Sequence, residues 1–210
     1  MKHEAGGSQA DRKQRAILGA AQTVFLRDGF AGASMDEVAR QGGVSKQTVY
    51  AHFSSKADLF AAVVTSLSVA VSGGRSAIAP VADAATDLEA PLTTYAERQL
   101  KAALTPDMMQ LRRLLIGEAA RFPELAAGLH EQGSQRAVSA LARELGRLSR
   151  AGLLEIDDPR AAAIDFIWLV LGEPLNRALL LGDEAIPSAR ALRAHAERAV
   201  GVFLSAYGRD

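Results

Sequence analysis

Basic and hydrogen-bonding side chains gather in one short stretch of this 210-residue sequence. Residues 38–57 contain Arg40, Lys46 and Lys56 but no aspartate or glutamate. A local excess of positive charge suits contact with the phosphates of nucleic acid. Lysine can donate to guanine and glutamine can pair with adenine, so Lys46 and its neighbour Gln47 are candidate readers of base sequence.

The chemistry of an enzyme has much weaker support. The sequence contains no G-x-x-x-x-G-K-[ST], G-x-G-x-x-G, G-x-S-x-G or H-E-x-x-H pattern. It has no cysteine, which excludes disulfides, thiolate metal sites and cysteine nucleophiles. The four histidines are scattered at His3, His52, His130 and His195. We therefore expect no catalytic residues, no metal site and no cofactor.

The elements that must position the basic stretch are two short helices. Ser34 followed by Glu37 has the spacing of a capping box and predicts a helix from Met35 to about Gln41. Two glycines end this helix, and Ser45 can cap a second one that begins at Lys46. Two short helices joined by a tight glycine turn form a helix-turn-helix.

The rest of the chain is also predicted to be helical. Aromatic residues make up 5% of the sequence, and alanine-rich stretches with 3.6-residue spacing replace any strand alternation. Further helices are expected near residues 10–28, 55–73, 88–104, 107–122, 124–151, 159–182 and 188–207. The fold class is thus all-α with about nine helices: a homeodomain-like helix-turn-helix domain over residues 1–56 and a helical bundle over residues 57–210. A flexible arm is expected at residues 1–9 and a linker at residues 73–87.

The net charge and the hydrophobic stretches of the sequence bear on where the protein is located in the cell. The chain has 24 basic and 24 acidic residues, and a net charge of zero argues against non-specific coating of nucleic acid. The longest uncharged stretch, residues 59–74, is too short and too rich in hydroxyls for a membrane span. The first ten residues lack the apolar run of a secretory signal. We expect a cytoplasmic protein without a membrane partner.

The segment that contains both short helices closely resembles the DNA-binding motif of the TetR family of bacterial repressors. The matching positions are Gly29, Phe30, Ser34, Met35, Val38, Ala39, Gly43, Val44, Ser45, Thr48, Val49, Tyr50, His52, Phe53, Lys56, Leu59 and Phe60. Two positions depart from the family's pattern: Gly42 stands where members usually have alanine, and Gln47 stands where they often have a small residue. The resemblance is direct over about the first sixty residues, whereas the second half matches in helix number and length.

A recognition helix enters the major groove with its N-terminal residues near the base edges. This geometry makes Lys46, Gln47 and Thr48 the predicted base readers, and the resemblance implies that Ser34, Tyr50, His52 and Lys56 hold phosphates. The candidate DNA-binding residues are Ser34, Ser45, Lys46, Gln47, Thr48, Tyr50, His52 and Lys56. The same lysines and glutamine also fit a merely solvated helix face.

The second half has more apolar surface than one chain can hide. Residues 166–171 are apolar in succession, so the helix around them must be covered on all sides. A four-helix seam between two copies of the chain would provide this cover. The candidate dimer residues are Leu171, Leu175, Leu192, Ala196, Val200 and Phe203.

An effector site is also expected in the second half, where a Pro174 kink could open an apolar cavity with a few polar anchors. The candidate effector-binding residues are Met108, Phe122, Phe166, Trp168, Glu173, Asn176 and Arg177. Core packing is the alternative for the apolar members of this set, and a polar surface edge is the alternative for the others.

The sequence therefore predicts a homodimeric transcriptional regulator that binds double-stranded operator DNA. It is expected to act as a repressor that releases a pseudo-palindromic operator when a small apolar effector binds the C-terminal domain. Two other classes stay open: a helical adaptor that uses the helix-turn-helix for protein contacts, and, with less support, a small α-helical enzyme.

Overall fold

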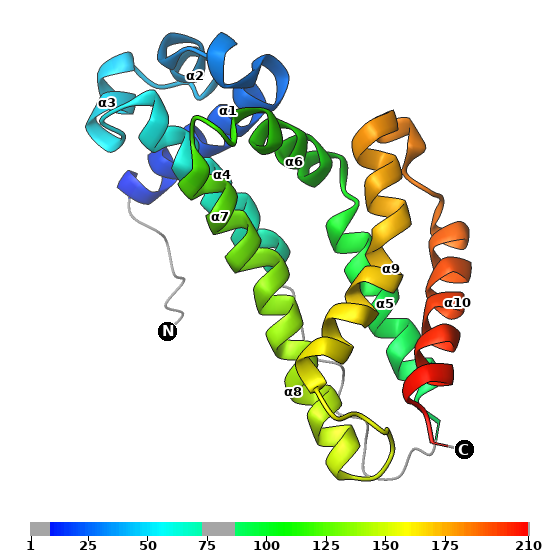
Figure 1. Cartoon of the computed structure of the whole chain (residues 1–210). Coiled ribbons are helices and arrows are strands. Elements are labelled where there is room, and N and C mark those ends of the chain that lie inside the picture. The colour runs from blue at the N-terminus through cyan, green and yellow to red at the C-terminus, as the bar shows by residue number, and fades with distance from the viewer. Residues whose placement is uncertain (1–8, 73–86, 210) are drawn as a thin grey trace, which may run out of the picture. The chain divides into compact units, whose positions relative to one another are not determined.

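The computed structural model describes residues 9–72 and 87–209, apart from the side chains of residues 68–72 and of Gln132 (Figure 1). Nearly all of the predicted arm and of the predicted linker lies outside these residues, and Gln9, the last residue of the predicted arm, begins α1. The helices in the described part are α1 (Gln9–Gly32), α2 (Met35–Gln41), α3 (Lys46–His52), α4 (Lys56–Ser72), α5 (Glu89–Ala103), α6 (Pro106–Glu118), α7 (Pro123–Leu129), α8 (Arg136–Arg150), α9 (Pro159–Leu181) and α10 (Ala189–Tyr207). The all-α prediction is confirmed.

One predicted helix, over residues 124–151, contains an irregular turn. A π-helical segment, η1 (His130–Gln135), joins α7 to α8, so the chain is helical from Pro123 to Arg150. Counted as one helix, this run gives the nine helices expected from the sequence within the described residues. A short 3₁₀ turn, η2 (Asp183–Ala185), follows α9.

The chain divides into two compact units. The first covers the described residues up to Leu67 together with Leu114–Ala126, and the second covers the described residues within 68–113 and 127–209. Helix α6 crosses the boundary between Arg113 and Leu114. The compact first unit therefore extends past residue 56, the predicted end of the DNA-binding domain.

The core of the first unit is aromatic. Gly29, at a φ of 71°, breaks α1 and turns Phe30 inward. The rings of Phe30 and Phe60 lie 5.2 Å apart, and Phe25 lies 5.0 Å from Phe60. Phe122 joins this cluster edge-on, at 4.6 Å from Phe30. The cluster thereby joins α1, α4 and the segment between α6 and α7.

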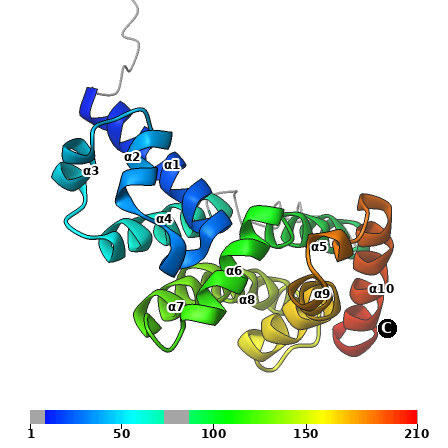
Figure 2. The ribbon, with the colours of Figure 1, turned by 90° about the horizontal axis from the view of Figure 1, so that it is seen from above.

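The second unit is a bundle in which α5, α9 and α10 lie side by side and α8 packs on α9 (Figures 1 and 2). Its core contains Leu100, Leu145 and the edge-to-face pair Phe166 and Phe203, whose rings are 5.1 Å apart. Asp158 caps α9 by accepting from the backbone N–H groups of the next turn. No described helix has the length and hydropathy required to cross a bilayer.

Helix α9 continues through Pro174, which is buried. Proline has no N–H, so the carbonyl of Val170, four residues earlier, loses its helical partner. His195 on α10 supplies a substitute, because its Nε2 lies 2.8 Å from that carbonyl oxygen and donates to it. The sequence predicts that Pro174 opens a cavity. The structure shows instead a hydrogen bond at this point, which links α10 to α9.

Candidate functional site

Two serines begin the helices of the helix-turn-helix. Ser34 Oγ accepts from the Glu37 N–H at 3.2 Å, and Ser45 Oγ accepts from the Thr48 N–H at 3.1 Å. The turn between the helices needs Gly43, whose φ of 62° is strained for residues with a Cβ. Both predicted caps and both predicted helix ranges agree with the structure.

Only one half of the predicted capping box forms at α2. The Glu37 carboxylate pairs with Arg40 at 2.6 Å and with Arg27 at 3.4 Å. Hydrogen bonds from Arg40 and Arg27 hold the pKa of Glu37 below its usual range. The Glu37 carboxylate therefore forms ion pairs with two guanidinium groups, which offset its negative charge.

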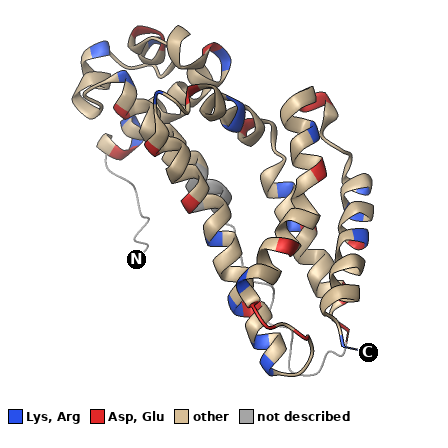
Figure 3. Cartoon of the chain, viewed as in Figure 1, with Lys and Arg blue, Asp and Glu red and all other residues tan. Residues whose placement is uncertain are grey.

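Helix α3 presents a polar, acid-free face. Lys46, Gln47 and Tyr50 are exposed, whereas Val49 is buried against the core of the unit. Figure 3 shows the N-terminal lysine of α3 and no acidic residue on that helix. An exposed basic and amide pair at the start of a helix is the arrangement that reads base edges in a major groove.

Lys46 already has a partner on the preceding helix. Its Nζ lies 2.7 Å from Asp36 Oδ1, and both side chains are exposed. The hydrogen bond that Lys46 donates to Asp36 raises the pKa of Lys46. Lys46 must therefore leave Asp36, or share it, to reach a base.

Lys56 is half-buried, and its ammonium group is held by other parts of the first unit. Its Nζ donates to the carbonyls of Ala33 at 2.9 Å and Ala31 at 3.3 Å, and it lies 4.7 Å from the centre of the Phe30 ring. These contacts tie the start of α4 to the end of α1. A phosphate contact by Lys56 stays a prediction, and it would compete with this structural role.

The remaining candidate DNA contacts surround α3. Thr48 Oγ1 is 2.8 Å from Ser45 Oγ, so the two hydroxyls share a hydrogen bond. His52 is half-buried beside the Phe53 ring, and Ser34 is exposed at the start of α2. The eight predicted residues thus all lie on α2, α3, their caps or the start of α4 in the first unit.

The predicted effector residues do not form one site. Met108 and Phe166 are buried, and Phe122 belongs to the aromatic cluster of the first unit. The others, Trp168, Glu173, Asn176 and Arg177, are exposed. None of the seven lines the pocket of about 480 Å³ in the second unit.

The predicted dimer residues also need correction. Leu192, Ala196, Val200 and Phe203 are buried in the core of their own unit, so they cannot face a second copy. Leu171 and Leu175 are half-buried against that core. The apolar side chains that α9 and α10 leave in solvent are Ile164, Trp168, Leu169, Leu180, Leu181 and Val202.

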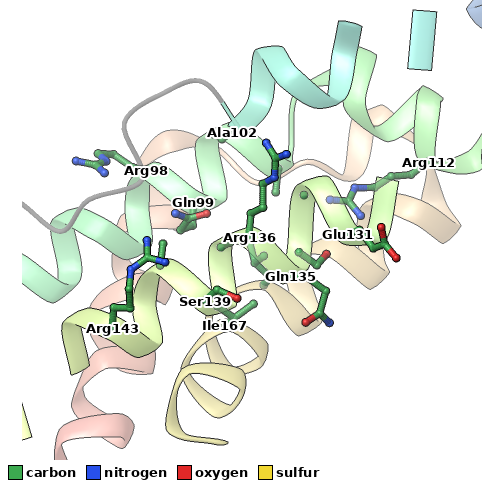
Figure 4. Close-up of a pocket in the computed structure, with 16 residues that line it drawn as sticks. Arg98, Gln99, Ala102, Arg112, Glu131, Gln135, Arg136, Ser139, Arg143 and Ile167 are labelled. Carbon is green, nitrogen blue, oxygen red and sulfur yellow. The ribbon is translucent and has the colours of Figure 1, made fainter. Parts of the chain in front are cut away.

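The pocket of the second unit lies between α5, η1, α8 and α9, and α6 contributes Arg112 (Figure 4). Its basic side chains are Arg98, Arg112, Arg136 and Arg143, and its acid is Glu131. The apolar lining consists of Ala102, Ala103, Ala137, Ala140, Ile167 and Leu171. This lining is far more basic than the apolar cavity expected from the sequence.

The sequence did contain a signal for the pocket arginines. Met108 and Leu115 are buried on α6, and Arg112 lies four residues after the first and three before the second. A charged residue on the buried stripe of a helix is unusual and indicates a specific role. Arg136 and Arg143 lie two turns apart on one face of α8, and both are exposed.

Comparison with known protein families gives two matches that together cover most of the chain. A model described as bacterial regulatory proteins of the tetR family matches residues 17–63. A model described as the C-terminal domain of an AefR-like transcriptional repressor matches residues 90–209. The boundary between the two matches falls where the sequence predicts a linker.

Solved structures resemble the chain over nearly its whole length. A TetR-family transcriptional regulator from Mesorhizobium loti MAFF303099 is 33% identical, with a TM-score of 0.88 and coverage of 97% of this chain and 100% of that one. The flavonoid-responsive regulator FrrA is 32% identical, with a TM-score of 0.74 and coverage of 94% and 98%.

Curated relatives match over shorter segments. The transcriptional activator FasR from Mycolicibacterium smegmatis is 37% identical over 101 residues, which are 45% of this chain and 46% of FasR. The transcriptional repressor SCO4008 from Streptomyces coelicolor is 42% identical over 48 residues, which are 23% of this chain and 25% of that protein. The chain thus matches less than half the length of these two relatives.

Proposed function

The chain belongs to the TetR family of bacterial regulatory proteins, and on that premise we propose that it is a homodimeric repressor whose affinity for operator DNA is controlled by a small molecule. The observation that carries the proposal is the α2–turn–α3 unit with its exposed, acid-free recognition helix. We place such a regulator in the cytoplasm, where bacterial DNA is located. Its proposed mechanism requires binding of the ligand and no chemical reaction of it.

Base reading is assigned to the first turn of α3. Gln47 is exposed and can pair with adenine, and Lys46 can exchange Asp36 for guanine. Ser34, Tyr50 and His52 flank this turn and are assigned to the DNA backbone, where contacts set position rather than sequence. Tyr50 is well placed for this role, because its side chain is 47% exposed.

Dimerisation is assigned to the exposed apolar face of α9 and α10, which we define by Ile164, Trp168, Leu169 and Val202. Trp168 is 63% exposed and Val202 is 56% exposed. Trp168, Leu169 and Val202 line one shallow hollow on this face. Exposed apolar side chains that gather on two adjacent helices favour a two-helix-on-two-helix seam between copies. A two-fold dimer in turn requires a pseudo-palindromic operator.

Ligand response is assigned to the second unit, and α6 is the element that can transmit it. This helix carries Arg112 in the pocket and continues past Arg113 into the first unit, where Phe122 packs on Phe30. A ligand that binds the two conformations of α6 unequally changes operator affinity by its difference in binding free energy. The response of FrrA to flavonoids supports a small-molecule ligand, and the AefR-like repressor match supports repression.

The experiment is a selection of fragments of the source genome by the full chain, followed by footprinting of the recovered sites. We expect a few sites with two-fold symmetric half-sites about 34–36 Å apart along the duplex. Gln47→Ala should relax the selected sequence at one or two positions, whereas Tyr50→Phe should weaken all sites alike. Recovery of fragments without a shared sequence would contradict the proposal and favour a helical adaptor.

A further inference from the structure

The pocket of the second unit collects positive charge in a part of the chain that is otherwise slightly acidic. Its lining has four arginines and one glutamate, a formal charge of +3. By contrast, residues 61–210 contain 16 basic and 18 acidic residues, a net charge of −2. Gln99, Ser134, Gln135 and Ser139 add hydrogen-bonding groups to the same lining. A cavity of about 480 Å³ has the size of a small-molecule site.

Arg112 is the most deeply placed of the four arginines. It lies on the buried stripe of α6 between Met108 and Leu115, each 2% exposed. Its Nε is buried and has no hydrogen-bond partner among the described atoms. Burial lowers the pKa of the Arg112 guanidinium. A buried guanidinium N–H without a partner costs folding free energy, so the Nε of this half-buried arginine is a donor that a bound group can satisfy.

The neighbouring residue, Arg113, has partners for its guanidinium group within the chain. Arg113 pairs with Asp183 and donates to the Ala178 carbonyl at 3.1 Å. Arg112 has no ion pair with any described residue, although Glu131 lines the same pocket and lies beside it in Figure 4. Arg136 and Arg143 likewise form no ion pair within the described part of the chain. The fold thus pairs Arg113, next to the pocket, whereas Arg112, Arg136 and Arg143 have no ion pair within the described residues.

The geometry points to an organic anion as the ligand of this pocket: a small molecule with one carboxylate or similar oxyanion, which Arg112 binds, on an apolar body. This inference rests on the proposed function and names the ligand class of its sensory site. A guanidinium binds a carboxylate through two parallel N–H bonds, and Arg112 Nε is one of the donors that a ligand would satisfy. Arg136 rises from α8 between Arg112 and Arg98 and adds to the positive field (Figure 4).

The rest of the lining accommodates the apolar body of such a molecule. Ile167 and Leu171 come from α9, and the alanines come from α5 and α8. The π-helical turn η1 contributes Glu131, Gly133, Ser134 and Gln135 to the wall. π-Helical turns occur frequently at functional sites, because they shift side chains out of regular helical register.

The test compares each acid with its neutral amide of the same shape. We would titrate 2-naphthoate and 2-naphthamide, cinnamate and cinnamamide, and decanoate and decanamide into the full chain by calorimetry, without DNA. At least one acid is expected to bind about tenfold or more tightly than its amide, as one charge-assisted contact predicts. Equal binding of acid and amide in every pair, or no binding of any acid at millimolar concentration, would overturn the inference.

Two variants assign the preference to Arg112. Arg112→Met should remove the difference between acid and amide and should keep or raise the melting temperature, because it deletes an unpaired buried charge. Arg113→Met should lower the melting temperature, since it removes the ion pair with Asp183 and the hydrogen bond to the Ala178 carbonyl. Arg190→Met, at an exposed position outside the pocket, should leave both properties unchanged. A fall in melting temperature with equal loss of acid and amide binding would give Arg112 a structural role and overturn the inference.

Failure of the inference and failure of the proposed function give different results. An acid that binds through Arg112 supports the anion site even when operator affinity does not change, in which case only the sensory part of the proposed function fails. Neutral ligands that bind the pocket and release the operator would support the regulator and overturn the anion site.

Discussion

Two lysines of the first unit carry the same charge but contact different groups. Lys46 pairs with an exposed aspartate, whereas the Nζ of Lys56 is held by two backbone carbonyls and the face of Phe30. The sequence predicts that both lysines contact DNA, because charge and position in a motif are visible in it. The partner of Lys56 comes from more than twenty residues earlier in the chain, and this pairing becomes visible only when α1 and α4 pack.

The first prediction separates these roles by stability. Lys56→Met should lower the free energy of unfolding by about 1–2 kcal/mol, because it leaves two carbonyls without a charged donor. Lys46→Met removes the same charge and should leave stability nearly unchanged, because exposed ion pairs contribute little. Urea denaturation followed by circular dichroism measures both. Equal stability of the two variants would show that the contacts of Lys56 have no energetic weight.

The second prediction concerns Asp36, the acid nearest the recognition helix. Asp36→Asn should free Lys46 and remove one repulsive charge, so affinity for any duplex should rise. Asp36→Glu keeps the charge and serves as the matched control, with affinity close to that of the natural chain. Fluorescence anisotropy with a labelled duplex at several salt concentrations measures the effect. A loss of affinity in Asp36→Asn would mean that the ion pair positions α3 for binding.

At the scale of elements, helix type and helix starts follow closely from the sequence. The caps at Ser34, Ser45 and Asp158 are local, since each serine or aspartate needs only the backbone of its own helix. The π turn between α7 and α8 was not predicted, because its side chains have no distinctive periodicity. The pocket was missed for a related reason: its lining comes from five segments that meet only in the folded bundle.

The third prediction tests the tie between α9 and α10. His195→Ala should destabilise the protein by about 1–2 kcal/mol, because it leaves the buried Val170 carbonyl without a donor. Pro174→Ala restores an N–H that can bond the same carbonyl within α9. In the Pro174→Ala background, His195→Ala should therefore cost much less. A double-mutant cycle by thermal denaturation measures this coupling, and strict additivity would argue against the assigned hydrogen bond.

At the scale of the whole molecule, our proposal assigns DNA recognition to the first unit and ligand response to the second. The first unit has an aromatic core, and the second has a separate core and a pocket. The sequence predicts that the last two long helices associate with a second copy. Most of the residues predicted for the dimer interface are buried in the core of the single chain. The sequence cannot separate the two cases, because apolar residues have the same helical spacing in a core and in an interface.

The fourth prediction uses the single tryptophan of the chain as a probe of the dimer. Trp168 is largely exposed in one chain, so its emission should shift to the red when a dimer dissociates on dilution. Val202→Glu should shift this transition to higher protein concentration, because it places a charge in the apolar seam. Arg190→Glu, outside the face defined above, is the control. Sedimentation of the natural chain as a stable monomer at micromolar concentration would contradict the assigned seam.

The most direct test of the regulator is the affinity of the full chain for a selected genomic site and for a scrambled duplex of the same length and composition. Anisotropy titrations at about 150 mM salt should give an affinity for the selected site about a thousandfold or more above that for the scrambled one. Both affinities should fall as salt increases, and Gln47→Ala should reduce the ratio by about 5–150-fold. Equal affinities for the two duplexes at every salt concentration would contradict the assignment of α3 as a reader of DNA sequence.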